Sequence, residues 1–588
     1  MMISTGLPFL FHGHRIFALI LVAIVMWETT PLAAQDIQPT YLMVSDPEFN
    51  VPVVPSVLPE GAISLWQNTL RSSEPELVKA AADSIAEAHA QGFPGLEVCA
   101  PELVKVLQFS DQHPVVIYAV CRALIELGES EAADQLFQAS QKGDTQLRML
   151  IEPAFVKWGY RPAIDLWIKR LEDSNTRRRD LILACEGLSV TQTATAVPLL
   201  VDIAVDRIRP SDLRLSAARA AGSIANEGLT DKAATLVEST DIDIYCALAL
   251  IGRDSGDDAQ NLLTRLASHP NPAIAAPPLR SLLNIAPVLV SPFAEDALVS
   301  SDPKIRQCGL DAYIALINEE RLPVIAGLLN DPHPNVRMSA RRALYAFSDN
   351  HAYRERILEL AMSQLLSEEW RAQEQATVLL VALDHKPAAL RLVELLRSER
   401  PEVLVTSAWG LRMLAVPETA DGIVKKIKRE SIGKPSVPYG DMQIGHLFEA
   451  CAILGEKRAL ESIPKYIPKD ITREKSRSAA IWAAGKLIDG EPNEKLASAL
   501  MERVKDINGT VEELRLVRQM SAVTIGRMHA DSQLEPLKDF VGDELHLDRV
   551  DYAIGWAIEK LSGERLPVAS IPELVRKGWP LQPFSNSQ

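Results

Sequence analysis

The sequence lacks the short motifs on which most catalytic, redox and metal sites are built. Its six cysteines include no CxxC pair, and it holds no CxxCH, HExxH, GxGxxG, GxxxxGK or GxSxG pattern. These motifs place thiolates, imidazoles or backbone N–H groups at spacings that bind metals, haem or phosphates. We therefore predict no catalytic residue, no metal ligand and no cofactor.

Aromatic residues are also scarce, at 5% of the 588 residues, although 47% of the chain is hydrophobic. The apolar content is therefore mostly Ala, Leu, Ile and Val, and strand-like alternation of β-branched residues is nearly absent. This composition is typical of packed helices. A chain of this length would be too large for one compact core.

Positive charge is the third deficit. The chain has 61 Lys and Arg residues and 77 Asp and Glu residues, which gives a net charge of −16. Binding to phosphate backbones requires a positive field, so no nucleic-acid partner is expected. Two basic runs, at 177–179 and 425–429, could form a local basic face. Charge runs are usually solvated helix surface or turn, which is our interpretation of both.

An apolar run of twelve residues, from Ile16 to Trp27, precedes the small-residue site Ala33-Ala34-Gln35. The run is too short for a comfortable transmembrane helix, and together with the small residues it is typical of a signal peptide cleaved after Ala34. We expect the mature protein to be periplasmic or secreted. An uncleaved anchor is the alternative, and membrane contact is expected only in that case.

A short pattern returns at intervals close to 31 residues. Pro272-Ala273-Ile274, Pro303-Lys304-Ile305 and Pro334-Asn335-Val336 are 31 residues apart, twice in succession. A fixed period in this range indicates a solenoid of stacked helical hairpins.

Small residues recur at every third position behind several arginines. The examples are Arg214, Ala217 and Ala220; Arg306, Gly309 and Ala312; Arg337, Ala340 and Ala343; and Arg477, Ala480 and Ala483. On a helix this spacing forms one stripe, along which a neighbouring helix can approach closely. These helices are therefore predicted to be packed on both flanks, as the inner helices of a solenoid are.

One hairpin can be followed completely in the sequence. An amphipathic stretch from Leu322 to Leu329 is followed by a turn at 330–334 and by a stripe helix from Val336 to Phe347. Asp331 can cap free backbone N–H groups, and the prolines of the turn end one helix and begin the next. The predicted unit is helix, tight turn, helix.

Residues 328–344 of this hairpin resemble the signature of the HEAT-repeat family almost throughout, and the resemblance extends over roughly residues 60–563. It implies an all-α fold, a right-handed α-solenoid of about fifteen HEAT-like hairpins, which is an armadillo-type architecture. The resemblance specifies the fold and says little about activity.

The resemblance also implies a structural role for four residues. In the family the turn Asp and the Arg that follows it tend to form ladders between repeats. This implies a ladder role for Asp302 with Arg306 and for Asp331 with Arg337.

The expected organisation of the chain has four parts. Residues 1–34 are the signal peptide, 35–60 an extended segment, 61–563 the solenoid and 564–588 a proline-rich tail. The end repeats of a solenoid expose a hydrophobic face, so either flank could cover one. We expect the extended segment to lie along the first repeats.

An insertion at 430–442 lengthens the step between two repeats to about 41 residues. Insertions in repeat proteins map to loops on one face, which is often the binding face. The insertion holds Val437, Pro438 and Tyr439, an aromatic residue on a stiffened loop, and we interpret these three as partner-binding residues. Tolerated filler is the alternative.

The six cysteines lie mostly in Ala- and Leu-rich stretches and are interpreted as small buried hydrophobic residues. A disulfide between Cys99 and Cys121 is the one pairing to test in an exported chain.

Together these features predict an exported, non-enzymatic scaffold that recognises a protein partner along the solenoid surface. The alternative is an enzyme that resembles the HEAT-like lyases and hydroxylases, or an accessory subunit of an envelope enzyme complex. The identity of the partner and the face that binds it are left open.

Overall fold

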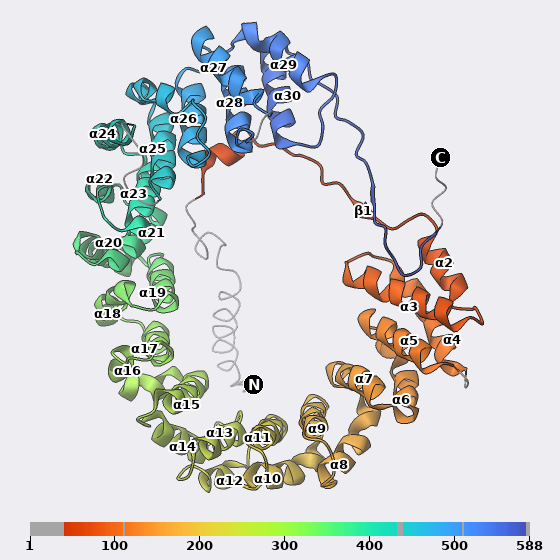
Figure 1. Cartoon of the computed structure of the whole chain (residues 1–588). Coiled ribbons are helices and arrows are strands. Elements are labelled where there is room, and N and C mark those ends of the chain that lie inside the picture. Colours follow the sequence, from red (N-terminus) through yellow and green to blue (C-terminus); the bar gives the residue numbers. More distant parts are fainter. Residues whose placement is uncertain (1–39, 110–111, 432–438, 508–510, 584–588) are drawn as a thin grey trace, which may run out of the picture. The chain divides into compact units, whose positions relative to one another are not determined.

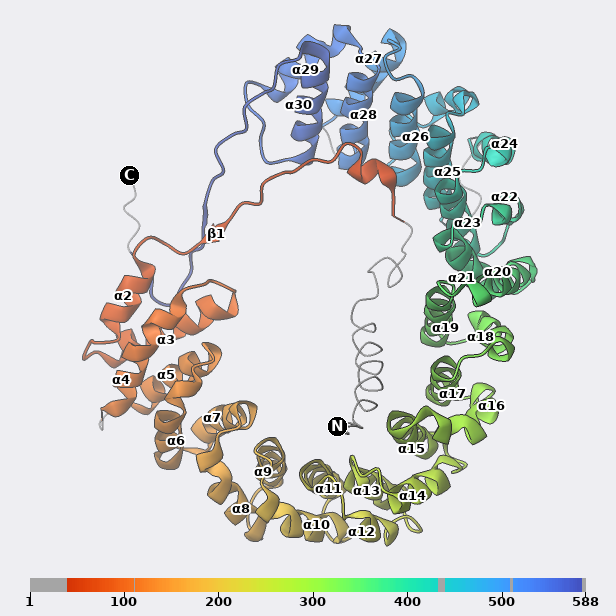
Figure 2. The same cartoon turned by 180° about the vertical axis from the view of Figure 1, so that it is seen from behind.

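The computed structural model describes residues 40–109, 112–431, 439–507 and 511–583 (Figure 1). Helices in these ranges follow one another as hairpins, and the view from behind in Figure 2 shows the same chain order within each part. Fifteen hairpins can be counted among the described residues, which confirms the predicted all-helical solenoid and its repeat number.

The first helix of each hairpin packs mainly against its own partner. These outer helices are α2 (Ala62–Thr69), α4 (Ala100–Gln108), α6 (Ala133–Lys142), α8 (Ile164–Glu172), α10 (Val197–Val205), α12 (Thr230–Ala234), α14 (Asp257–Ala267), α16 (Ser291–Leu298), α18 (Leu322–Gly327), α20 (His351–Leu366), α22 (Ala389–Leu395), α24 (Ala420–Glu430), α27 (Glu494–Val504) and α29 (Leu534–Val541). In the thirteenth hairpin the 3-10 turns η12 (Lys457–Glu461) and η13 (Ile463–Lys465) take this place.

The second helix of each hairpin, here called an inner helix, also packs against inner helices of neighbouring hairpins in the same unit. The inner helices are α3 (Pro75–Ala90), α5 (Pro114–Glu126), α7 (Thr145–Trp158), α9 (Arg178–Val190), α11 (Ser211–Ala225), α13 (Asp241–Ile251), α15 (Pro272–Ile285), α17 (Pro303–Ala315), α19 (Pro334–Phe347), α21 (Trp370–Ala382), α23 (Pro401–Leu414), α25 (Gly440–Leu454), α26 (Glu474–Leu487), α28 (Arg515–Arg527) and α30 (Arg549–Ser562).

Short 3-10 turns lead into many outer helices or link the two helices of a hairpin. They are η3 (Leu96–Cys99), η4 (Ser130–Ala132), η5 (Arg161–Ala163), η6 (Ala194–Ala196), η7 (Pro287–Val290), η8 (Glu319–Arg321), η9 (Leu328–Asn330), η10 (Lys386–Ala388), η11 (Pro417–Thr419) and η14 (Asp531–Gln533). The only strands among the described residues are β1 (Ser56–Val57) and β2 (Leu574–Val575), which pair in parallel.

The chain divides into two compact units. Of the described residues, unit 1 holds 40–52 and Leu316–Ser570, and unit 2 holds Val53–Ala315 and 571–583. Each unit thus combines a run of consecutive hairpins with a short piece from the opposite end of the chain.

The predicted stripe of small residues is confirmed. Ala340 is fully buried and Ala343 is 8% exposed, and the corresponding residues of α11, α17 and α26 are buried as well. Some positions admit no side chain at all, because a Cβ atom on Gly222 would lie 2.0 Å from the carbonyl oxygen of Ala249 on the next inner helix. Gly222, which is not itself one of the stripe residues, therefore sets how closely α11 and α13 pack.

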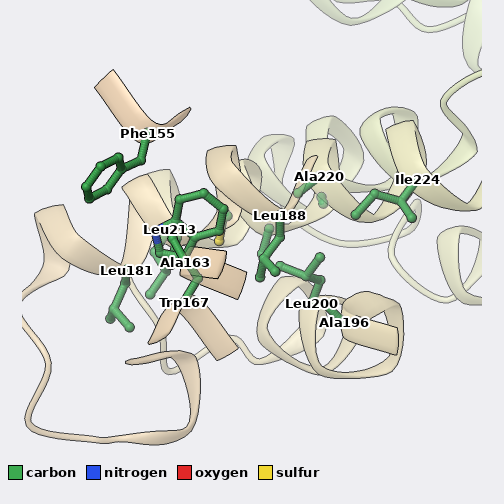
Figure 3. Close-up of a cluster of buried hydrophobic side chains, with 14 of the residues drawn as sticks. Phe155, Ala163, Trp167, Leu181, Leu188, Ala196, Leu200, Leu213, Ala220 and Ile224 are labelled. Atoms are coloured by element: carbon green, nitrogen blue, oxygen red, sulfur yellow. The ribbon is translucent and has the colours of Figure 1, made fainter. Parts of the chain in front are cut away.

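Large apolar side chains fill the space between the two helix rows. Figure 3 shows one such cluster in unit 2, where Trp167 of α8 lies among Leu181, Leu188 and Leu213. A Cβ atom on Gly187 would lie 2.7 Å from the Trp167 ring, so glycine makes room for the indole. All six cysteines are buried and free. Their interpretation as buried hydrophobic residues is confirmed, and the proposed Cys99–Cys121 disulfide is wrong.

The expectation that residues 35–60 are extended and lie along the first repeats holds for residues 53–60, which belong to unit 2 and pack Leu58 against its core, but it is wrong for residues 42–45. Residues 42–45 form a 3-10 turn, η2 (Leu42–Ser45), and this turn packs against α26, far along the chain. Residues 1–39, with the expected signal peptide and its cleavage site, lie outside the described residues.

Candidate functional site

Residues 40–46, the N-terminal segment, lie against four inner helices of unit 1, α23, α25, α26 and α28 (Figure 1, red turn beside α26). Their hydrogen-bond partners are 372 to 481 residues away in the sequence. We call the residues that hold this segment the segment-binding site; they are Arg412, Gly445, His446, Glu449, Trp482 and Arg527.

Tyr41 makes the most side-chain contacts that can be named between the N-terminal segment and α25. Its ring stacks on the His446 imidazole, with 4.2 Å between centroids and 5° between planes, and its hydroxyl donates to the Met442 carbonyl at 3.0 Å. Gly445 makes room for the ring, because a Cβ atom there would lie 2.8 Å from Tyr41 Cε1. Burial raises the pKa of the Tyr41 hydroxyl, and the nearby carboxylates Asp441 and Glu449 add to the shift. The phenol therefore stays a neutral hydrogen-bond donor.

Glu449 and Arg412 hold the main chain of the segment. The Met43 N–H donates to Glu449 Oε1 at 2.8 Å, and Arg412 Nη1 donates to the Thr40 carbonyl at 2.7 Å. The two side chains also pair with each other at 2.7 Å, with 5% and 0% of their area exposed. A buried charge pair is stable only when its remaining hydrogen-bonding atoms find partners, and here the segment supplies two of them.

Asp46 forms the other end of the contact. Its carbonyl oxygen accepts from Trp482 Nε1 at 2.8 Å, and its carboxylate pairs with Arg527 Nη2 at 2.8 Å and with Lys486 at 3.3 Å. The Arg527 guanidinium lies over the rings of Trp482 and Trp556, at 5.7 and 5.9 Å from their centroids. The cation is thus fixed in position where the carboxylate arrives.

Buried and partly exposed side chains alternate between Tyr41 and Asp46. Met43 is completely buried, whereas Leu42 and Val44 are each 39% exposed. The site therefore contacts positions 41, 43 and 46 of the chain through their side chains or amides, and it leaves the intervening positions partly in solvent.

His446 is the least satisfied polar residue of the site. It is fully buried, and neither ring nitrogen has a hydrogen-bond partner within the described chain. Nδ1 lies 3.6 Å from Glu449 Oε2, which is too long for a hydrogen bond. Burial lowers the pKa of His446, and the Glu449 carboxylate offsets part of that effect. The imidazole is accordingly neutral under the Tyr41 ring.

The other end of the chain, residues 574–582, is called the C-terminal tail and belongs to unit 2. Trp579 is 6% exposed and packs edge-on against Trp66 and Phe93, with ring centroids 6.1 and 5.6 Å apart. Trp66 Nε1 donates to the Leu581 carbonyl at 2.7 Å, and Leu574 in β2 donates to the Pro55 carbonyl at 3.0 Å. The tail covers the first hairpin, α2 and α3.

Of the three predicted partner-binding residues, Val437 and Pro438 lie outside the described residues. Tyr439 is 58% exposed and lies directly before α25 with a φ of 67°. The predicted insertion at 430–442 is shorter in the structure, because α24 extends to Glu430 and α25 begins at Gly440. The binding role of the three residues stays a prediction.

The four residues of the predicted ladder contact their own turns. The Asp302 and Asp331 carboxylates accept N–H groups two or three residues further on, and Arg306 and Arg337 donate to carbonyls five or six residues earlier. These contacts shape each turn. A ladder between repeats through these residues stays a prediction.

Buried ion pairs between successive repeats occur at residues that the sequence patterns did not pair. Arg214 in α11 pairs with Asp243 in α13, and Arg477 in α26 pairs with Glu513 at 2.7 Å, with both side chains of the second pair buried. Burial alone would raise the pKa of Glu513, but hydrogen bonds from Arg477 hold it below its usual value. Both arginines are the first residues of predicted stripes, so the sequence pattern singled out the arginine of each pair but not its acidic partner.

Of the histidines that precede turn prolines, His113 and His333 are N-caps, whereas His269 lies two residues before the N-cap Asn271. Nδ1 of His113, His269 and His333 accepts the N–H two residues further on, at 3.3, 3.0 and 3.3 Å. Their side chains thus shape the turns that lead into the inner helices.

Comparison with known proteins supports the repeat assignment at one place. Residues 322–351, which include α18 and α19, match the model of the HEAT repeat family. That hairpin is a HEAT repeat, as its turn and stripe predicted. A comparison with curated proteins finds no match.

Several solved structures are similar to this chain at low sequence identity. Yeast importin-β (Kap95p) is 13% identical, with 85% of this chain and 73% of that chain covered and a TM-score of 0.44. A structure of Kap95p with RanGDP is 14% identical, covers 85% and 72%, and has a TM-score of 0.47. Kap121p bound to RanGTP is 13% identical, covers 85% and 64%, and has a TM-score of 0.43.

No helix in the described ranges combines the length and the apolar character that a membrane crossing would need.

Proposed function

We propose that the protein is an exported, non-enzymatic scaffold that binds a protein partner through the inner helices of unit 1. One observation carries this proposal: buried polar side chains of four inner helices hold main-chain groups of a polypeptide, the N-terminal segment. A surface that binds one polypeptide in this way has the chemistry to bind another.

Export is supported by the apolar run and small-residue site at the N-terminus of the sequence. The free, buried cysteines are compatible with an oxidising compartment, because none of them is exposed for a mixed disulfide. In this proposal the mature chain begins near Gln35, a few residues before the N-terminal segment.

The loop that holds Val437, Pro438 and Tyr439 is proposed as a second contact for the same partner. Tyr439 is exposed and precedes α25, the helix that supplies Glu449 to the segment-binding site. Exposed aromatic residues on a rigid support often anchor protein interfaces.

Site-directed photo-crosslinking in the native host tests the proposal. A photoreactive amino acid at Met413, which is 50% exposed on the inner helix α23, is expected to crosslink one protein in the envelope or secreted fraction. The matched control places the same group at Leu390, which is 61% exposed on the outer helix α22. Crosslinks at Leu390 alone, or none at either position, would contradict the proposed surface.

The loop is tested in the same assay. Replacing Val437-Pro438-Tyr439 with Gly-Ser-Gly is expected to reduce the Met413 crosslink. The circular dichroism spectrum should stay helical, because the replaced residues lie between α24 and α25 and in neither helix. An unchanged crosslink would make the loop tolerated filler.

A further inference from the structure

The contacts of the N-terminal segment resemble those of a bound ligand more than those of a core element. Its partners include a fully buried histidine without a hydrogen bond and a buried Arg412–Glu449 pair whose remaining atoms the segment satisfies. Apolar side chains of similar size would usually stabilise a fold at least as well as such a pair. Stability alone therefore does not explain these residues, and peptide recognition does.

We propose that the segment-binding site recognises the pattern aromatic, any residue, apolar, any two residues, acidic, and that residues 41–46 are a tethered occupant which a partner segment of that pattern displaces. This inference rests on the proposed function, because it names the chemistry by which the partner is recognised. The partner is a protein with an accessible segment of this pattern.

Each position of the pattern follows from a contact. The aromatic ring is required by the stack on His446 and by the space above Gly445, and a hydroxyl at its tip reaches the Met442 carbonyl. The apolar position is set by the burial of Met43, and the acidic position by Arg527 and Lys486.

The intervening positions are free to vary because Leu42 and Val44 are partly exposed. The amide at the apolar position and the carbonyl at the acidic position are main-chain groups that any peptide carries. The pattern can therefore be recognised in segments of unrelated sequence.

Displacement is favoured by the position of the occupant in the chain. It lies before α2, the first helix of the hairpin series, so its departure breaks no hairpin. When it leaves, Met43 and the Tyr41 ring lose their apolar contacts, while the polar groups of Arg412 and Glu449 can be satisfied by water or by a new peptide. The attachment through residues 47–61 keeps the occupant at a high effective concentration near the site. The fraction of molecules with an empty segment-binding site is therefore small in the absence of a competing peptide.

Fluorescence anisotropy with a labelled synthetic peptide of residues 38–50 tests this inference. Two full-length mature proteins are compared: the wild type and the double variant Tyr41→Ala, Asp46→Ala, in which the tethered occupant is weakened and every site residue is intact. The peptide is expected to bind the double variant saturably and at least tenfold more tightly than the wild type.

Peptide variants provide matched controls that leave the protein unchanged. Tyr41→Ala or Asp46→Asn in the peptide is expected to weaken binding about tenfold, the size typical of one lost hydrogen bond to a charged or buried partner. Leu42→Ala in the peptide is expected to change affinity less than about threefold, because that side chain is partly exposed. Equal binding to both proteins, or equal binding of all peptides, would overturn the inference.

A second variant decides the matter if the double variant fails to fold. A protease site inserted after Asn50 leaves all site and segment residues in place, and cleavage removes only the tether. The labelled peptide is then expected to exchange into the cleaved protein and not into the uncleaved one. Absence of exchange in the cleaved protein would make the segment a permanent part of unit 1.

The two proposals fail separately. Peptide binding in this assay with crosslinking at Leu390 alone would keep the recognition pattern and reject the partner surface. A partner crosslinked at Met413 without any peptide binding would keep the function and reject the pattern.

Discussion

The N-terminal segment and the C-terminal tail are both held by helices far away in the sequence, but polar and apolar contacts have different weights at the two ends. The tail inserts Trp579 among apolar rings, Trp66 and Phe93. The segment is held chiefly by hydrogen bonds and ion pairs from Arg412, Glu449 and Arg527. Losing the tail would expose chiefly aromatic surface, which is unfavourable in water. Losing the segment would expose Met43, but also buried polar groups that water can solvate.

This difference assigns different roles to the two ends. The tail is expected to stay in place as the cover of an end hairpin, in the manner of a solenoid cap. The segment is expected to exchange with other peptides. Four measurements test the contrast.

The largest effect is expected at the tail. Trp579→Ala should lower the free energy of unfolding of unit 2 by about 3–5 kcal/mol, because it removes a nearly buried indole and leaves a cavity against Trp66. Urea unfolding measures the loss. The control Leu574→Ala, at a side chain that is 49% exposed, should cost much less. Equal losses in the two variants would mean that Trp579 is not the anchor.

At the segment, Tyr41→Ala should have a smaller and more local effect. Its stacked ring and its hydrogen bond are each worth about 0.5–1.5 kcal/mol, so attachment should weaken by about 1–3 kcal/mol. Hydrogen exchange at the Met43 amide reports this loss directly. Leu42→Ala is the control, and a drop in global stability as large as that of Trp579→Ala would erase the contrast between the two ends.

Gly445→Ala tests the site from the opposite side. The added Cβ would lie 2.8 Å from the Tyr41 ring, which must move, while alanine favours the helix by up to about 1 kcal/mol. The Cβ would also lie 3.2 Å from the Lys475 carbonyl oxygen of α26, so global stability should fall somewhat, but protection of the Met43 amide should fall further. Gly327→Ala, where a Cβ meets nothing within 4 Å, should leave that amide protected. If the Met43 amide stays protected in Gly445→Ala, the Tyr41 ring does not depend on the absence of a side chain at position 445.

The smallest effect is a dependence on pH. Burial lowers the pKa of His446 below its ordinary value of 6.5, so the unfolded or released state binds the proton first. Attachment of the segment should therefore weaken as the pH falls below about 6.5 toward the folded pKa. Arg412 adds to this preference for the neutral ring, Glu449 opposes it, and the Tyr41 hydroxyl stays neutral throughout.

The measurement is Met43 amide protection between about pH 7 and 5, the range in which histidines titrate, compared with His446→Gln. Any contribution from His385, whose pKa is also lowered by burial, is common to both proteins and cancels. Identical pH profiles would show that His446 does not cause the pH dependence of attachment.

The repeat architecture was predictable because its determinants are local. The turn at 330–334 and the stripe with Ala340 and Ala343 are set by residues within one hairpin, and the structure places them as the 31-residue period predicted. Repeats that resemble their neighbours also repeat the same signal, which strengthens it.

The segment-binding site was not predictable on the same basis. Glu449 and Arg412 are 37 residues apart, and their occupant is 372 to 406 residues away from them. Contacts at such separations leave no period in the sequence. The one local hint was that Trp482, a large aromatic residue, interrupts the small residues of a stripe helix.

The wrong expectation for residues 40–46 has a specific cause. Prolines and apolar residues correctly indicated that the segment forms no long helix, but nothing in it indicated a destination, and proximity in sequence does not imply proximity in space. Tyr41 is held by α25 instead, because there Gly445 and His446 offer a slot of matching shape and chemistry.

The chain passes between the two units three times, after residues 52, 315 and 570. Ribosomes make a protein from its first residue to its last. Trp66 is therefore synthesised 515 residues before Leu581, whose carbonyl accepts a hydrogen bond from the Trp66 indole N–H. Asp46 is synthesised 481 residues before its partner Arg527. Through most of synthesis the rings of Trp66 and Phe93 therefore lack Trp579, the side chain that covers them in the finished protein.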